Sequence, residues 1–491
     1  MKTYLYTIAE IRALEQQAIQ AGIAEYQLMQ RAGKAALKIL LEHYPNLKSL
    51  DIVCGKGNNG GDGYVLAHLA SLEDIDVSIY ELAQLSDLSP TAQKAAKVCH
   101  ADVSHKIKCH PFSDSVAFQG DVLVDAILGI GAQTSPKNSA IPTAIQAINA
   151  SHKPVVALDV PSGLDADQGG AFVGAVVADL TITFIGIKRG MLTGLAPNYC
   201  GNIVVDTLDL NIPPSSESVI LSSQALPQRK PADHKGLFGH TLVIGGDIGM
   251  GGAVCLAAEA ALRTGSGLVT ALTHPEHVPV LLTRCPEVMC HGVSEQMHLP
   301  SFFSSLATKI TACVIGPGMT DSPWSNALLN YCLKNISVPM VLDAGAFYWL
   351  ISNKMPPQPH WILTPHPGEA ARLLQLTSAD IQQARFTHAK ALQKKYNAII
   401  VLKGAGTLIC DDQNTLIKVS SYHNSAMATA GMGDVLSGII GSLVAQGYSP
   451  AHAASQGVSL HSEAGELAYH SASKIRPRQT LLAHELFPYL G

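Results

Sequence analysis

Acidic side chains follow three apolar runs in the first half of the sequence. Asp62 lies in a glycine-rich segment after residues 50–54, Asp125 lies near the end of run 122–127, and Asp159 follows run 154–158. The carboxyl ends of parallel strands share one edge of a sheet, where ligands bind. We therefore expect one crevice lined by these carboxylates, and oxygen ligands without His or Cys suit a hard cation. Asp125 and Asp159 could equally cap turns.

The glycine-rich segment 55–63 reads Gly-Lys-Gly-Asn-Asn-Gly-Gly-Asp-Gly. Its glycines at 55, 57 and 60 fit the dinucleotide-binding fingerprint, in which backbone N–H groups and the positive end of a helix, expected over 64–72, approach a phosphate. Glu81, at the end of the next strand, lies where a ribose-binding acid is expected. Glycine-rich turns are also common structural features, so the segment by itself does not establish a nucleotide site.

A second chemical motif, Thr429-Ala430-Gly431-Met432-Gly433-Asp434, opens a long helix in the second half. The helix start offers free backbone N–H groups and a positive dipole, which favour a phosphate. A carboxylate there repels phosphate, so Asp434 is better suited to accept a proton beside it. The pattern favours phosphoryl transfer to a hydroxyl group. The alternative is that Asp434 is an ordinary N-terminal acid stabilised by the dipole.

Alternating helical patterns and short apolar runs position these motifs in two α/β domains. A capping box at Thr7–Glu10 predicts an opening helix, and a second helix is expected over 26–43. A Pro/Ser-rich stretch after Asn211 marks the boundary, giving domains 1–215 and 216–491. We expect strands at 50–54, 77–80, 122–127, 154–158, 180–185, 241–245, 268–272, 312–315, 339–342, 361–363 and 399–402, and late helices at 433–446 and 451–469.

Composition excludes several classes of protein. With 491 residues, 47% hydrophobic and 14% charged, the chain is globular. A net charge of −5 gives no field that would hold a nucleic-acid backbone, so we expect no nucleic-acid partner. The ten cysteines show no CxxC pair or metal-like spacing and are interpreted as reduced core thiols. Without a signal-like or membrane-spanning apolar stretch, we expect a cytoplasmic protein with no membrane partner. Composition leaves the oligomeric state open, including a homo-oligomer.

The first-half motifs resemble the epimerase domain of NAD(P)H-hydrate repair enzymes, which interconverts the R and S forms of hydrated NADH or NADPH. The resemblance implies a Rossmann-like three-layer α/β/α domain with Asp159 as the catalytic residue at the reacting ring. It also implies a potassium ion bound by Asn59, Asp125 and Ser162. Lys188 is either a charged helper or a solvated lysine. The residues implied to bind the hydrate are Asn58, Asn59, Gly60, Gly61, Asp62, Gly129, Ile130, Gly131, Ala132, Gln133, Thr134, Ser135 and Asp159.

The second-half motifs resemble the ribokinase-like, ADP-dependent NAD(P)H-hydrate dehydratase domain of the same family. These motifs are 234–236, 315–318, 363–369, 403–407 and 429–434. The resemblance implies a catalytic Asp434, hydrate contacts from Ala253, Gly318, His366 and Asp434, and nucleotide contacts from Lys403, Gly404, Ala405, Gly406, Thr407 and Gly433. It also implies ADP as co-substrate, with magnesium. Two departures concern local contacts: Gly345 stands where the family usually has an acid, and Leu237 where a polar residue is common.

The fused order of the two motif sets implies a bifunctional enzyme acting on small molecules. The dehydratase would consume the S form at the expense of ADP, giving AMP and phosphate, and the epimerase would supply that form from the R form. Two alternatives stay open at this point. The second domain could be a small-molecule kinase that uses ATP, and the first could be a non-catalytic nucleotide-binding module.

Overall fold

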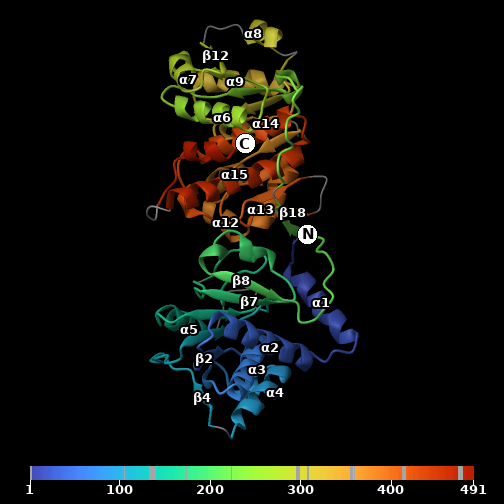
Figure 1. Cartoon of the computed structure of the whole chain (residues 1–491), viewed down its shortest axis with the longest axis vertical. Coiled ribbons are helices and arrows are strands. Elements are labelled where there is room, and N and C mark those ends of the chain that lie inside the picture. Colours follow the sequence, from blue (N-terminus) through green and yellow to red (C-terminus); the bar gives the residue numbers. More distant parts are fainter. Residues whose placement is uncertain are drawn as a thin grey trace. The chain divides into compact units, whose positions relative to one another are not determined.

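The structure is a computed structural model that describes residues 3–103, 105–131, 140–172, 174–222, 224–294, 299–306, 309–353, 358, 360–411, 416–473 and 479–490. The chain divides into two compact units, Thr3–Ser218 and Val219–Gly491. In Figure 1 the first unit runs from blue to green and the second from green to red. Both are α/β units, the fold class that the sequence predicts.

The sheet of the first unit has the strand order β4-β3-β2-β5-β6-β7-β8, and every pair in it is parallel. The predicted strands are present, and β4 and β8 are additional. Both lie at sheet edges and are partly exposed, so they lack the apolar run of a buried parallel strand. The strands are β1 (Tyr4–Leu5), β2 (Ser49–Cys54), β3 (Asp76–Glu81), β4 (Ile107–Pro111), β5 (Val122–Ala126), β6 (Val155–Leu158), β7 (Leu180–Phe184) and β8 (Asn202–Asp206).

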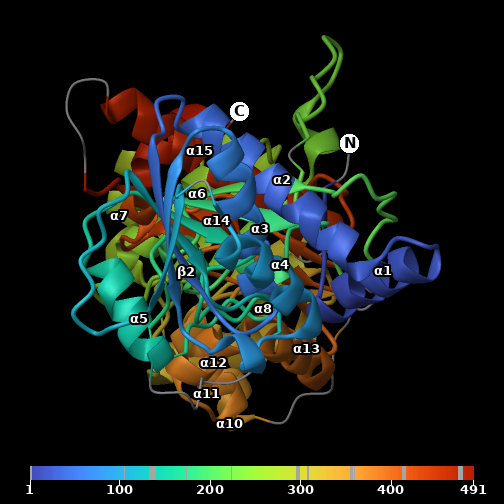
Figure 2. The same cartoon turned by 90° about the horizontal axis from the view of Figure 1, so that it is seen from below.

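Helices cover both faces of this sheet, as Figure 2 shows for α2, α3 and α4 on one side and α5 on the other. The predicted capping box at Thr7 and Glu10 is present at the start of α1. The helices are α1 (Ile8–Gln20), α2 (Glu25–His43), α3 (Asn58–Leu72), α4 (Pro90–His100) and α5 (Ala140–Asn149), with short 3-10 helices at Leu85–Asp87, Arg189–Leu192 and Ala196–Asn198.

The start of α3 differs from the prediction. The helix was expected over 64–72 but begins at Asn58, with Gly57 as its N-cap, so the glycine-rich segment forms the first turns rather than a loop. Glycine is required at position 60, because a Cβ there would lie 2.0 Å from the carbonyl oxygen of Gly55. The local contact with the preceding turn therefore overrides the weak helix propensity of glycine.

The sheet of the second unit follows the order β9-β18-β17-β16-β15-β14-β13-β10-β11-β12. Its strands from β16 to β12 are parallel, whereas β16, β17 and β18 pair antiparallel. The strands are β9 (Ser218–Ile220), β10 (His240–Ile244), β11 (Leu268–Thr273), β12 (Met289–Gly292), β13 (Ala312–Ile315), β14 (Met340–Leu342), β15 (Trp361–Leu363), β16 (Ile399–Leu402), β17 (Leu408–Cys410) and β18 (Ile417–Val419).

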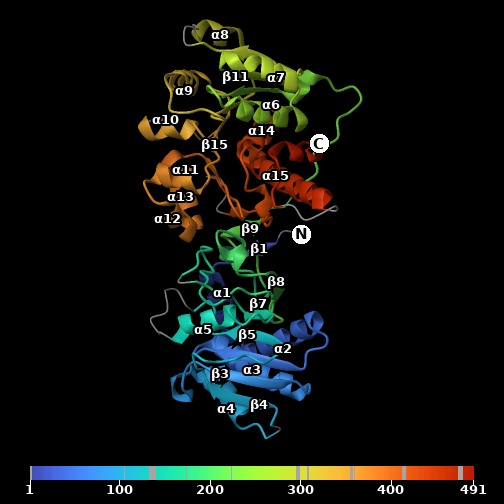
Figure 3. The same ribbon diagram turned by 90° about the vertical axis from the view of Figure 1, so that its left-hand side faces the viewer.

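Figure 3 shows α9, α10, α11 and α13 on one side of this sheet and α6, α14 and α15 on the other. The second group buries alanine, valine and leucine side chains against the strands. The helices are α6 (Gly251–Arg263), α7 (Val278–Arg284), α8 (Leu299–Leu306), α9 (Pro323–Asn335), α10 (Ala346–Ser352), α11 (Pro367–Leu374), α12 (Ser378–Gln383), α13 (Arg385–Tyr396), α14 (Met432–Ala445) and α15 (Pro450–Ser473), with 3-10 helices at Lys235–Phe238, Pro275–His277, Ser425–Met427 and Ala483–Tyr489. Within the described ranges, none of the helices has the length and apolar character needed to cross a membrane.

Candidate active sites

A cavity of about 750 Å³ opens at the carboxyl ends of β2, β5 and β6 in the first unit. It lies where the strand order reverses between β2 and β5, the usual ligand position in an open α/β sheet. The start of α3 and the turn after β5 form its walls, together with α1, which the sequence did not connect with any site. The predicted residues that line the cavity are Asn58, Asn59, Asp62, Gly129, Ile130, Gly131 and Asp159.

Other predicted residues of this site lie elsewhere. Gly60 and Gly61 are buried in α3 and pack behind the cavity wall. Ala132, Gln133, Thr134 and Ser135 fall outside the described residues. The expectation for Glu81 was wrong, because its carboxylate accepts a hydrogen bond from Tyr64 Oη at 2.7 Å and contacts His100 instead of lining the cavity.

Asp159 has a buried cationic partner. Lys188 is completely buried, and its ammonium group donates to Asp159 Oδ1, to Thr183 Oγ1 at 2.8 Å and to the Phe184 carbonyl oxygen at 3.0 Å. The interpretation of Lys188 as a solvated lysine is therefore wrong. Asp159 also accepts from the Ile130 amide at 3.1 Å, which fixes the second carboxylate oxygen.

The backbone of Asp159 is strained, with φ at 66° in the left-handed region. Such a conformation is costly for a residue with a side chain and persists where the surrounding structure imposes it, often at functional sites. In this case the strained backbone and the contact with Lys188 together hold the carboxylate at the cavity wall.

Two further acids in the cavity are shifted toward their neutral forms. Burial, reinforced by the charges of Asp159 and Glu15, raises the pKa of Asp62 well above its usual range. Burial and the charge of Asp159 also raise the pKa of Glu15, a residue of α1. The cavity thus combines a carboxylate paired with an ammonium group and acids that retain a proton more readily, an arrangement that separates acid and base roles.

Asn59, Asp125 and Ser162, the predicted potassium ligands, are all buried. Ser162 Oγ donates to Asp125 Oδ1 at 2.6 Å, and the Ser162 amide donates to Oδ2 at 2.8 Å. Burial raises the pKa of Asp125 to about 6. Asn59 is only 6% exposed, yet neither atom of its amide group has a partner among the described residues. The unpartnered amide oxygen of Asn59 and the buried carboxylate of Asp125 are the kinds of ligand that a hard cation prefers.

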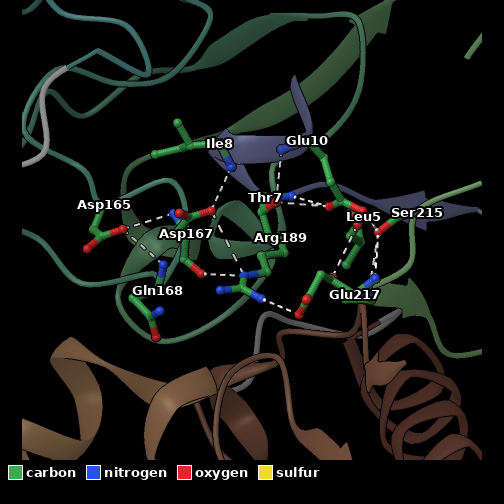
Figure 4. A network of polar contacts seen from close by, with 11 residues as sticks. Leu5, Thr7, Ile8, Glu10, Asp165, Asp167, Gln168, Arg189, Ser215 and Glu217 are labelled. Carbon is green, nitrogen blue, oxygen red and sulfur yellow. Dashed lines mark hydrogen bonds and ion pairs between the residues drawn. The ribbon is translucent and has the colours of Figure 1, made fainter. Parts of the chain in front are cut away.

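Figure 4 shows the polar network around Arg189, the residue that follows Lys188 in the sequence. Arg189 donates from Nε to the Asp167 carbonyl oxygen at 3.0 Å and from Nη1 to Glu217 at 3.4 Å. Asp167 Oδ1 in turn accepts from the Ile8 amide at 2.8 Å, at the first residue of α1. The network therefore ties the start of α1, which contributes to the cavity, to the segment of Lys188.

In the second unit three of the predicted residues follow strands of the parallel part of the sheet. The order β16-β15-β14-β13-β10 brings the carboxyl ends of these strands side by side. Lys403 follows β16, His366 follows β15 and Gly318 follows β13. A Cβ on Gly318 would lie 2.9 Å from Ala253 Cβ, so these two predicted hydrate contacts are neighbours. His366 caps α11 by accepting from the Gly368 amide at 3.0 Å.

A charged cluster that the sequence analysis missed surrounds Lys403. Its ammonium group lies 2.9 Å from Asp343 Oδ1 and 3.9 Å from Glu369 Oε2. Asp343 Oδ2 accepts from Ser437 Oγ of α14 at 2.5 Å. Asp343 directly follows a predicted strand and Glu369 ends the motif 363–369, and these were the available signals, although neither residue was predicted to belong to the site.

The cluster sets the proton affinity of Asp434. Burial and the like charges of Asp343 and Glu369 outweigh the effect of Lys403 and raise the pKa of Asp434 to about 7. Burial likewise raises the pKa of Glu369 to about 7. A carboxylate with a pKa near neutrality is suited to accept a proton during catalysis. Gly433 allows the Lys403 ammonium group to lie close to the start of α14, since a Cβ on this residue would lie 3.1 Å from Lys403 Nζ.

A buried arginine fixes the start of the predicted nucleotide loop 403–407 by hydrogen bonds to its backbone. Arg385 donates to the carbonyl oxygens of Leu402 at 3.0 Å and Lys403 at 3.2 Å. Gly404 then adopts φ of 134°, and Thr407 Oγ1 donates to its carbonyl oxygen at 3.1 Å. The turn is thereby fixed with Gly404 and Ala405 exposed.

The fold and the two sites define a two-domain α/β enzyme with separate acid–base centres. Residues 25–190 match the YjeF-related protein N-terminus family, and residues 241–487 match the carbohydrate-kinase-like family described as NAD(P)H-hydrate dehydratase. The bifunctional NAD(P)H-hydrate repair enzyme Nnr of Coxiella burnetii is 45% identical over 99% of both chains. That of Escherichia coli K12 is 40% identical over 98% of this chain and 92% of its own length. The chain belongs to the family of bifunctional NAD(P)H-hydrate repair enzymes.

Solved structures also resemble part of the chain. An ADP/ATP-dependent NAD(P)H-hydrate dehydratase from Bacillus subtilis, co-crystallized with ATP and Mg²⁺, is 30% identical, covers 54% of this chain and 92% of its own, and has a TM-score of 0.46. The family assignment rests on the full-length relatives.

Proposed function

We propose that the first unit epimerises the R and S forms of hydrated NADH and NADPH, and that the second dehydrates the S form with ADP. The observation that carries this proposal is the presence of two different acid–base centres. Asp159 lines a cavity and pairs with buried Lys188. Asp434, with a pKa near 7, interacts with Lys403 and lies in the first turn of α14, where free backbone N–H groups can bind a phosphate.

In the first unit, C6 becomes planar when its bond to the hydroxyl oxygen or to N1 breaks, and the same bond then forms again on the opposite face of C6. Asp159 accepts the proton of the attacking water or of the C6 hydroxyl group and afterwards returns it. Lys188 orients the Asp159 carboxylate, because its ammonium group donates to three oxygen atoms, of which Asp159 Oδ1 is one. Asp62, whose raised pKa favours the protonated form, is placed to donate a proton to the departing oxygen or ring nitrogen.

The first unit is proposed to bind a potassium ion at Asn59, Asp125 and Ser162. The unpartnered amide oxygen of Asn59 and the buried carboxylate of Asp125 are the supporting observations. The ion would supply positive charge near the cavity wall. The backbone N–H groups at the start of α3, capped by Gly57, face the negatively charged part of a dinucleotide substrate.

In the second unit, Asp434 removes the proton of the C6 hydroxyl group as its oxygen attacks the β-phosphorus of ADP. The phosphoryl group moves to that oxygen and AMP leaves. The C6–O bond then breaks with the aid of the N1 lone pair, phosphate departs, and loss of the C5 proton restores the dihydropyridine. Backbone N–H groups of Gly433 and its neighbours, with Lys403, stabilise the transferring group.

ADP is proposed to contact the loop 403–407 and Gly433, and magnesium would neutralise charge on its phosphates. The described carboxylates nearest to Lys403 are Asp343 and Glu369, which suit a hard cation. Gly345 does not remove acidic chemistry from the site, because Asp343 supplies a carboxylate two residues earlier.

The free state of all ten cysteines supports a reducing compartment such as the cytoplasm.

The test uses a mixed R/S hydrate of NADH with enzyme, potassium and magnesium, with and without ADP. We expect complete ADP-dependent return of near-ultraviolet dihydropyridine absorbance, with AMP and phosphate formed in equal amounts, faster than spontaneous epimerisation. Return of only the S fraction would refute the role of the first unit. A stable phosphorylated product without dihydropyridine would favour the small-molecule kinase alternative.

A further inference from the structure

Three metal-ligating side chains meet at the outer part of the sheet of the first unit, on elements that the hydrate chemistry does not use. Glu81 ends β3, His100 ends α4, and Cys109 lies in β4. One ligand atom from each residue lies within 4.8 Å of the other two. Among the residues the structure describes, no other group of three or more such side chains has this proximity.

The sheet register explains why these residues meet. Strands β3 and β4 are parallel, and Cys109 is paired with Ile79. Side chains alternate between faces along a strand, so Glu81, two residues after Ile79, points to the same face as Cys109. Helix α4 ends over this face, where His100 Nε2 lies 2.8 Å from Glu81 Oε1. The spacing of these residues in the sequence, 19 and 9 positions apart, resembles no local metal motif.

The carboxylate is oriented from behind by a buried tyrosine. Tyr64 Oη donates to Glu81 Oε1 at 2.7 Å, and Cys99 Sγ contacts the Tyr64 carbonyl oxygen at 3.1 Å. Such outer partners are typical of metal ligands, which they hold in position. The side chains of His100 and Glu81 are 34% and 18% exposed, and Cys109 is half-buried, so an ion can reach the group and retain a water ligand.

The donor set of thiol, imidazole and carboxylate favours zinc. Calcium and magnesium prefer oxygen ligands alone, whereas Zn²⁺ binds sulfur, nitrogen and oxygen and accepts three protein ligands with a fourth open position. A histidine–carboxylate ion pair accounts for Glu81 and His100 but leaves Cys109 without a role. Glu81 and Asp102 also place negative charge beside Cys109, which attracts a cation.

We propose that Glu81, His100 and Cys109 form a zinc-binding site that joins β3, α4 and β4. The site is distinct from the hydrate cavity, whose walls include none of the three residues. Zinc binding would hold the edge strand β4 to the body of the unit, since each ligand comes from a different element.

The test titrates the full-length, chelator-treated protein with Co²⁺, a spectroscopic substitute for zinc. We expect one Co²⁺ per chain, with an intense thiolate-to-cobalt band in the near ultraviolet that disappears when Zn²⁺ displaces the cobalt. Cys109→Ser should abolish the band, and His100→Ala should weaken Co²⁺ binding at least 100-fold. Cys290→Ser is the matched control, because Cys290 is the other half-buried cysteine and lies in the second unit.

A further variant distinguishes weaker metal binding from a loss of the fold. Tyr64→Phe removes only the hydrogen bond to Glu81 and should weaken Co²⁺ binding about 10-fold, the lower range for loss of such an outer partner. Circular dichroism of each variant checks that the fold is retained. The proposal is overturned if a folded wild-type protein gives no thiolate band, or if the band persists unchanged in Cys109→Ser.

Discussion

The two units surround the carboxylates that we propose as catalytic with different charges. Asp159 of the first unit contacts a completely buried ammonium group and lies next to acids whose pKa values are raised. For Asp434 of the second unit, burial and the charges of Asp343 and Glu369 raise the pKa to about 7 against the effect of Lys403. In the first unit the raised pKa values belong to the neighbours Asp62 and Glu15, whereas in the second unit the raised pKa is that of Asp434 itself.

The difference follows from the reactions. An epimerase must both remove and return a proton in one cavity, which favours separate acid and base groups with divergent pKa values. A group that only deprotonates a hydroxyl during phosphoryl transfer works best with a pKa near the working pH. Each of the following substitutions tests one side of this contrast.

Asp159→Asn should lower epimerisation about 10³-fold, because general acid–base catalysis contributes factors of this order. Dehydration of the purified S form should be unchanged. The measurement is the rate of R-to-S conversion by chromatography, with dehydration of the S form as the internal control. An unchanged epimerisation rate would make the first unit a non-catalytic binding module.

Asp434→Asn should have the converse effect, lowering ADP-dependent dehydration about 10³-fold through loss of the base. Epimerisation should continue at the wild-type rate. AMP release and dihydropyridine absorbance follow the first activity, and chromatography of the two epimers the second. If both activities fell equally in a folded variant, the two centres would not be independent.

Lys188→Met should destabilise the protein by about 3–5 kcal/mol, because it leaves the buried carboxylate of Asp159 without its partner. Denaturant unfolding measures the loss. The double variant Asp159→Asn/Lys188→Met should recover much of the stability without recovering epimerisation. Equal destabilisation by the single and double variants would mean that the ion pair contributes no coupling.

Gly433→Ala should raise the KM for ADP about 10-fold, corresponding to roughly 1.4 kcal/mol. The added methyl group would lie 3.1 Å from Lys403 Nζ and displace the ammonium group from the nucleotide. Steady-state kinetics at varied ADP measures the change. Gly252→Ala is the control, since a Cβ there meets no atom within 4 Å; the same KM shift in both variants would contradict the explanation.

Asp343→Asn should shift the pH dependence of dehydration. Asp434 must be ionised to act as a base, so kcat/KM falls as the pH drops through about 7 in the wild type. Removing the Asp343 charge lowers the pKa of Asp434, and the acidic limb should move down by about one unit. A pH profile of kcat/KM for the S form tests this. A limb that stays near pH 7 would show that Asp343 does not set the pKa.

The sequence predicted the framework well where the pattern was local. Strands β13, β15 and β16 begin and end where the apolar runs do, because buried parallel strands require continuous apolar residues. It failed for β4 and β8, whose edge positions permit polar residues, and for the first turns of α3, where glycines are tolerated because of contact with the Gly55 turn. It also placed Glu81 in the wrong site.

The sequence by itself located three acids at the ends of elements, since strand ends and helix starts are set by local patterns: Asp125 near the end of a buried strand, Asp159 directly after one, and Asp434 in the first turn of a helix. Only the tertiary structure decided their partners. Lys188 meets Asp159 across 29 residues and Lys403 meets Asp343 across 60. Glu15 enters the cavity from a helix outside the matched family segment. Proton affinity depends on burial and on charges within a few ångströms, and those distances are fixed by packing between elements that are remote in the chain.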